Sequence, residues 1–249
     1  MPSSNWLSRV KALFGGRRAG PPPIDWPAWE ARIQRIVASD VERVLPYFPE
    51  DGVIVDVGAN VGIFTSTLLA KRPKARAFCF EPVHEFYERC KTRFADNSAV
   101  VVENLALGDV SGATTIYKPA HNPGGNSIVK VQVDKFSSKN VVLWSEEAVQ
   151  VRVFDEYARE KKLTRIDLVK TDTEGHDYAV LKGVVPFLER TGARPVILSE
   201  LLAKSLHHAW DEQAAVVARL EALGYEHADL DSMREIDDIL FVPKGRART

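Results

Sequence analysis

Two glycines and an acid in the first third of the chain have the spacing of a nucleoside-binding turn. In VIVDVGANVGIF, residues 53–64, an apolar run changes to Gly58-Ala-Asn-Val-Gly62 and then becomes apolar again at helical spacing. Glycines there allow the backbone to bend sharply and a ligand to approach without a Cβ in the way. Glu81 follows about twenty residues later, the distance at which an acid hydrogen-bonds ribose hydroxyls. The pattern indicates a nucleoside-containing cofactor.

The residues around the glycines favour S-adenosylmethionine over NAD. The dinucleotide fingerprint is Gly-x-Gly-x-x-Gly, with a pyrophosphate at the helix N-terminus, whereas the spacing here is Gly-x-x-x-Gly. Asp56 precedes Gly58 by two residues, where a carboxylate repels a pyrophosphate but suits an ammonium or sulfonium group. S-adenosylmethionine carries both cations and a ribose. An NAD(P)-dependent oxidoreductase is the first alternative, and a methyltransferase-like binding module without turnover is the second.

The glycine turn requires a strand before it and a helix after it, and the sequence repeats this alternation. We predict core strands at residues 53–57, 75–81, 99–104, 166–172 and 194–200, a small hairpin around 109–112, and a final antiparallel pair at 225–231 and 237–244. Alternating strands and helices are typical of a largely parallel sheet that helices cover on both faces. The predicted fold class is therefore α/β and Rossmann-like.

Residues 119–147 form a polar, glycine-containing and irregular segment. A loop of this length inside a compact domain is often a lid or a binding loop, so we expect it to bind substrate. Asn122, Asn126 and Ser127 offer amide and hydroxyl groups that suit a sugar or another polar acceptor. A plain surface turn is the alternative for this stretch.

The bulk properties exclude several classes of protein. A net charge of -1 and a pI near 6.6 argue against a nucleic-acid binder. No uncharged apolar run reaches the roughly 18 residues that span a bilayer, and two cysteines do not suggest a disulfide framework, so a cytoplasmic location fits best. We expect a domain over residues 26–249 after a basic tail, 1–25. Residues 5–18 of this tail have the pattern of a short amphipathic helix. Two interpretations stay open: a helix in weak contact with the inner membrane face, and a disordered tail.

Four stretches together resemble the FkbM-family methyltransferases. They are VDVGANVGIFT, FEPVHEFYERCKTRF, ENLALGD and IDLVKTDTEGHDYAVLKG, and the resemblance covers residues 45–243. It implies a class I fold with strand order 3-2-1-4-5-7-6 and an antiparallel seventh strand. It also implies S-adenosylmethionine as cofactor and O-methylation of a hydroxyl on a sugar, glycan or natural product.

The resemblance also suggests roles for individual residues in cofactor binding. It places the methionine and ribose part beside Asp56, Gly58, Asn60 and Gly62, the ribose hydroxyls on Glu81, and the adenine edge near Asn104 and Ala106.

Acids and an imidazole follow the strand at 166–172, where a base for a hydroxyl acceptor belongs. Asp172 or His176 is the predicted base, and Glu174 and Glu200 would shape the pocket. Asp172 should need a partner, because an acid that ends a buried strand is costly. Two alternatives stay open: Glu174 as a cap of the following helix and His176 as a surface or capping residue. No metal is predicted, because three ligands within five positions converge only if the turn folds back.

Overall fold

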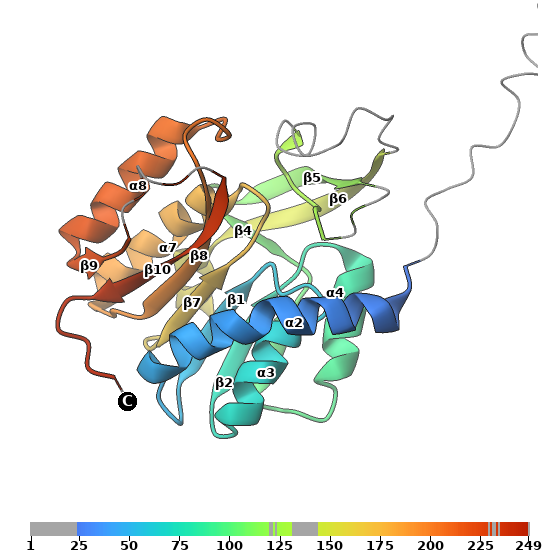
Figure 1. The fold of residues 1–249 in the computed structure, drawn as a ribbon, viewed down its shortest axis with the longest axis horizontal. Coiled ribbons are helices and arrows are strands. Elements are labelled where there is room, and N and C mark those ends of the chain that lie inside the picture. Colours follow the sequence, from blue (N-terminus) through green and yellow to red (C-terminus); the bar gives the residue numbers. More distant parts are fainter. Residues whose placement is uncertain are drawn as a thin grey trace, which may run out of the picture.

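A seven-stranded sheet with helices on both faces forms the centre of the protein (Figure 1). The computed structural model describes residues 24–119, 122, 124–130, 144–228, 230, 233 and 235–248. Residues 5–18, with their predicted membrane contact, lie outside this range, as do most of residues 119–147. Within the described residues, the helices are each too short or too polar to cross a membrane.

The order of the strands agrees with the predicted class I topology. Across the sheet lie β3 (Val100–Glu103), β2 (Arg76–Phe80), β1 (Val53–Val57), β7 (Leu168–Thr171), β8 (Val196–Leu202), β10 (Ile236–Pro243) and β9 (Tyr225–Glu226). The pairs from β3 to β8 are parallel, and β10 is antiparallel to both of its neighbours. β1 and β7 are buried along their whole length, as expected for central strands of a sheet covered on both faces.

The helices divide into two layers, one on each face of the sheet. Those on one face, which share a core with β1 and β7, are α6 (Phe154–Glu160), α7 (Asp177–Thr191) and α8 (Trp210–Ala222). Those on the other are α2 (Trp26–Val44), α3 (Ile63–Lys71) and α4 (His84–Arg93), with the short turn η1 (Leu45–Tyr47) after α2. Asp25 caps α2 by accepting a hydrogen bond from the Ala28 N–H.

A second sheet of three strands lies beside the carboxyl ends of the main sheet (Figure 1). In it, β6 (Trp144–Val153) lies between β4 (Ala106–Gly108) and β5 (Gly112–Pro119), parallel to β4 and antiparallel to β5. The hairpin predicted around 109–112 is wrong, because β4 and β5 each pair with β6 and not with one another. Residues 144–147 likewise belong to β6 and not to a loop.

Helix α7 crosses β4 at a point where backbones touch. A Cβ on Gly183 of α7 would lie 2.2 Å from the carbonyl oxygen of Gly108. Because a backbone atom cannot rotate away, this crossing requires a residue without a side chain. It joins the small sheet to the main body of the protein.

We predict that Gly183→Ala lowers the free energy of unfolding by about 2 kcal/mol. Overpacking against backbone costs up to about 3 kcal/mol, and the helix propensity of alanine returns about 1 kcal/mol. Thermal unfolding should show a fall in Tm of about 4–8 °C. Gly112→Ala is the matched control, because nothing lies within 4 Å of a Cβ there. Equal Tm values for the two variants would contradict the role of this contact.

Candidate active site

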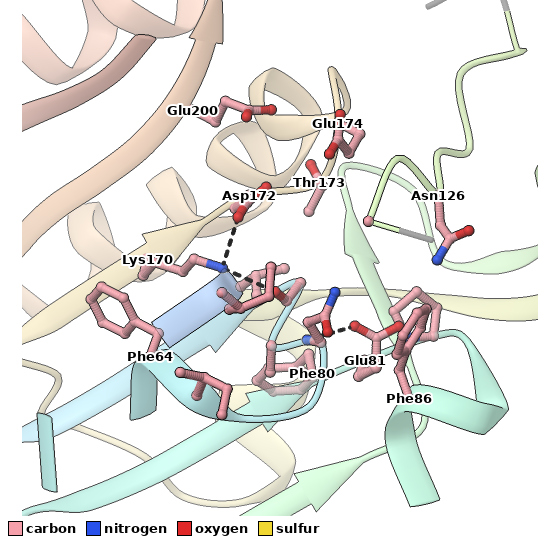
Figure 2. A pocket seen from close by; sticks show the side chains of 18 of the residues that line it. Phe64, Phe80, Glu81, Phe86, Asn126, Lys170, Asp172, Thr173, Glu174 and Glu200 are labelled. Atoms are coloured by element: carbon pink, nitrogen blue, oxygen red, sulfur yellow. Dashed lines mark hydrogen bonds and ion pairs between the residues drawn. The ribbon is translucent and has the colours of Figure 1, made fainter. Parts of the chain in front are cut away.

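A cavity of about 290 Å³ lies at the carboxyl ends of β1, β2, β7 and β8 (Figure 2). This is the edge at which open α/β sheets bind ligands. Of the residues predicted from the sequence, those that line it are Gly58, Asn60, Glu81, Ala106, Asn122, Asn126, Asp172, Glu174, His176 and Glu200. Four other predicted residues do not line the cavity but contact residues that do: Asp56, Gly62, Asn104 and Ser127.

The glycine turn packs against the end of β7. Gly58 has a φ of +71°, and a Cβ there would lie 1.9 Å from the Asp172 carbonyl oxygen. Gly62 has a φ of +79°, and its Cβ would lie 2.7 Å from the Phe94 ring and 2.9 Å from Cys90 Sγ. Gly58 therefore lets the turn meet β7 beside the cavity, whereas Gly62 lets α3 pack against α4.

Glu81 is a buried carboxyl group at the wall of the cavity, with 5% of its surface exposed. Oε2 accepts a hydrogen bond of 2.8 Å from the Asn60 N–H, and Oε1 accepts one of 2.9 Å from the Val83 N–H. Burial raises the pKa of Glu81 to about 7, although the two N–H donors oppose the shift. Each oxygen keeps acceptor capacity for a further donor.

Asn104 lies behind this wall. Its Nδ2 donates to the carbonyl oxygens of Glu81 and Pro82, at 2.9 and 2.8 Å. The amide thus fixes the backbone after β2, and Ala106 reaches the cavity itself.

Lys170 is the cation at the centre of the site (Figure 2). It comes from the middle of β7, its side chain is 9% exposed, and Nζ donates to the Gly58 carbonyl oxygen at 2.9 Å. The same Nζ lies 3.4 Å from Asp56 Oδ1 and 3.5 Å from Asp172 Oδ2. Burial alone would lower the pKa of Lys170, but the two carboxylates outweigh it and raise that pKa above its usual range.

Asp56 is compensated by this lysine and does not face a ligand directly. It is fully buried, and its Oδ2 accepts a 2.7 Å hydrogen bond from Thr65 Oγ1 of α3. The expected direct attraction between Asp56 and a cationic cofactor is therefore largely cancelled by Lys170. Asp172 is the carboxylate of this group that reaches the cavity.

Asp172 is 45% exposed, so the expected cost of burying it does not arise. It follows β7 directly and faces the cavity. Glu200, on neighbouring β8, also faces the cavity, and burial raises its pKa well above the usual range. Among the described residues, Glu200 Oε2 has no hydrogen-bond partner.

Glu174 adopts a left-handed backbone conformation, with a φ of +56°. Burial, with the nearby charge of Asp172, raises its pKa to about 8. Its side chain does not cap α7, whose N-cap residue, His176, makes no side-chain cap hydrogen bond. The carboxylate of Asp177 accepts from the Thr173 N–H at 3.2 Å and so closes the turn that precedes the helix. Such a backbone conformation in a non-glycine residue is uncommon and often marks a functional site.

Ser127 holds the Glu174 turn from the other side. It is buried, its Oγ donates to the Glu174 carbonyl oxygen at 2.8 Å, and it accepts from the Val129 N–H. The predicted substrate contact of Ser127 is thus replaced by a link between the 124–130 segment and the end of β7. Asn122 and Asn126 are the polar residues of this segment that line the cavity.

His176 begins α7 as its N-cap residue and lines the cavity. Its ring lies edge-on to Tyr178, with centroids 6.0 Å apart. Burial lowers the pKa of His176 to about 4, which leaves the imidazole neutral but a weak base at pH 7. By position alone, Asp172 is the better placed of the two predicted bases, because it is 45% exposed and lies beside the glycine turn.

The sequence analysis did not predict two parts of the cavity, namely Lys170 and the residues of α2. The sequence does carry a signal for Lys170, because a lysine inside the otherwise apolar strand IDLVKTD is unusual. Trp29, Arg32, Ile33, Ile36 and Val37 of α2 also line the cavity, and their amphipathic spacing indicates only a buried face. As for metals, the described residues hold no group of three His, Cys, Asp or Glu side chains that could bind one.

Residues 56–227 match the Methyltransferase FkbM domain. The chain belongs to the FkbM methyltransferase family. One relative is the methyltransferase sdnD of Sordaria araneosa, which is 32% identical over 55% of this chain and 61% of sdnD. Another is the 2-O-methyltransferase NoeI of Sinorhizobium fredii, which is 26% identical over 66% of this chain and 68% of NoeI. The hexuronic acid methyltransferase AglP of Haloferax volcanii is 26% identical over 65% of this chain and 62% of AglP. The match thus spans about three fifths of the length of sdnD and AglP.

We predict that Lys170→Met destabilises this FkbM domain by about 3–5 kcal/mol, because it leaves Asp56 charged, buried and unpaired. Chemical denaturation measures the loss, and the double variant Asp56→Asn/Lys170→Met should recover part of it. Arg219→Met is the control, since its ion pair with Glu189 is exposed and should contribute less than about 1 kcal/mol. A double variant no more stable than Lys170→Met would show that the ion pair is not the cause.

Proposed function

We propose that this protein transfers the methyl group of S-adenosylmethionine to a hydroxyl oxygen of a sugar or of a natural product. The observation that carries the proposal is the meeting of the glycine turn, Glu81 and Asp172 in one cavity of an FkbM domain. Because these groups come from β1, β2 and β7, their convergence requires the whole sheet.

The chemistry of the cavity walls fits S-adenosylmethionine. Glu81 can accept hydrogen bonds from both ribose hydroxyls, and the walls near it are apolar enough for an adenine ring. That apolar wall consists of Phe80, Pro82, Phe86, Ala106 and Leu107. Asp172, at the other side of the glycine turn, supplies a negative charge for the cationic methionine end.

Bound S-adenosylmethionine supplies an electrophilic methyl group. The residues of the chain then have two tasks, to align the acceptor oxygen with that group and to take its proton. Alignment can contribute about 7–11 kcal/mol. Asp172 takes the proton, because it is the exposed carboxylate beside the glycine turn. Proton transfer of this kind adds about 10²–10⁴-fold in rate.

The choice of acceptor rests on the relatives and on two amides. NoeI is named a 2-O-methyltransferase and AglP a hexuronic acid methyltransferase, so hydroxyl-rich acceptors occur among the relatives. Asn122 and Asn126 line the cavity with groups that both donate and accept hydrogen bonds. This supports a sugar or another polyhydroxylated molecule.

The two alternatives have less support. An NAD(P)-dependent oxidoreductase would need a turn that holds a pyrophosphate, and here Asp172 faces the cavity beside the turn. A binding module without turnover would not need the exposed Asp172 together with its buried lysine partner.

We predict that calorimetric titration detects S-adenosylmethionine binding at micromolar concentration and no binding of NAD. Glu81→Gln should weaken binding by about tenfold to a hundredfold at pH 8, because it removes a charged acceptor of ribose hydroxyls. Glu88→Gln, on the exposed face of α4, is the control. Binding of NAD alone would overturn the proposed function.

The affinity should also depend on pH. Ribose hydroxyls donate to the ionised form of Glu81, whose pKa is raised by burial to about 7. Affinity should therefore be fully present above pH 7 and fall by up to about tenfold for each pH unit below it. Titrations between pH 5.5 and 8 should show this fall in the parent chain and a flatter profile in Glu81→Gln. Equal profiles would show that another group titrates.

A further inference from the structure

Helix α2 contributes a wall of the cavity although it lies outside the family domain. The domain match begins at residue 56, and α2 ends at Val44. Trp29, Ile33, Ile36 and Val37 have the i, i+4, i+7, i+8 spacing of one helical face, and all four line the cavity. The part of the site that lies outside the matched domain is thus an apolar one.

Contacts at both ends hold α2 in place over the cavity. At its start, Trp29 is buried, its indole Nε1 donates to Asn60 Oδ1 at 3.4 Å, and the ring fills the space beside Gly124. At its end, Val41 and Val44 are fully buried in the core shared with α3. The α2 wall of the cavity is therefore held in a fixed position before a ligand binds.

Ile36 stands out on this wall because it is 51% exposed. Among the described residues, only Val101 and Val110 are other large hydrophobic side chains with comparable exposure. Ile36 lines the same cavity as Asp172 and Glu200, so a molecule whose hydroxyl reaches Asp172 can cover Ile36 with another part of itself. Leaving this side chain in water is unfavourable, and an apolar ligand group would remove that contact with water.

We propose that Ile33, Ile36 and Val37 form a subsite for an apolar group that the acceptor carries beside its hydroxyl-bearing part. The acceptor is then an alkyl or aryl glycoside, or a natural product with a hydrocarbon portion, and not a free hydrophilic sugar. This inference rests on the proposed function, because it assigns the hydroxyl to Asp172. Beyond that function, it specifies an apolar group on the acceptor and names Ile36 as the residue that selects for this group.

The test uses two probes that differ only in their apolar group, methyl β-D-glucopyranoside and octyl β-D-glucopyranoside below its micelle concentration. Calorimetric titrations are made with and without saturating S-adenosylhomocysteine. We expect the octyl glycoside to bind at least about tenfold more tightly than the methyl glycoside. Ile36→Ser should lower the octyl affinity by about threefold to tenfold and leave the methyl affinity unchanged.

Val110→Ser is the matched control. Val110 is 72% exposed and lies between β4 and β5, away from the cavity lining, so this variant should leave both affinities unchanged. Both substitutions are at exposed positions, and neither should prevent folding.

Three outcomes would overturn the subsite. They are no binding of the octyl glycoside, equal affinities for the two glycosides, and an octyl preference that Ile36→Ser does not reduce, which would place the octyl chain elsewhere on the protein. Failure of S-adenosylhomocysteine to bind would count against the proposed function and not against the subsite, because the glycosides are also titrated alone. Binding of S-adenosylhomocysteine without an octyl preference would remove the subsite alone.

Discussion

A single buried ammonium group, that of Lys170, holds the site together. It bonds to the Gly58 carbonyl oxygen and lies between Asp56 and Asp172, so it joins the turn after β1 to the end of β7. A charge buried in the centre of a sheet is tolerated only with partners of this kind. The position of the glycine turn relative to Asp172, on which the proposed chemistry depends, follows from this arrangement and from the missing Cβ at Gly58.

Several carboxyl groups at the cavity have raised pKa values, which favours their protonated forms. Burial raises the pKa of Glu81 to about 7 and that of Glu174 to about 8, and it moves the pKa of Glu200 in the same direction. Protonation of these groups removes part of the repulsion between neighbouring carboxylates. A cationic ligand would favour their ionised forms, and binding of such a ligand would then release protons.

The cavity has a deep part at the strand ends of the main sheet and a cover formed by elements outside that sheet. The deep part comes from the ends of β1, β2, β7 and β8, where spacing is fixed by the sheet. The cover comes from α2 and the 124–130 segment, which meet where Trp29 packs against Gly124. Because the cover does not belong to the sheet, it can differ between relatives without disturbing cofactor binding, which makes it the natural place for acceptor selection.

The sequence by itself determined the core strands, the glycine turn and the acids at the strand ends, which follow from local signals such as apolar runs and glycine spacing. The strand order followed from the resemblance of four stretches to the FkbM family. Ten of the predicted site residues line the cavity. Tertiary structure alone decided that β6 lies between β4 and β5, that Asp56 is paired with Lys170, and that Ser127 supports Glu174 instead of facing a ligand. It also decided that α2 lines the cavity. The physical reason is the same in each case: these contacts join residues far apart in the chain, and a local pattern shows that a residue is buried without showing what it is buried against.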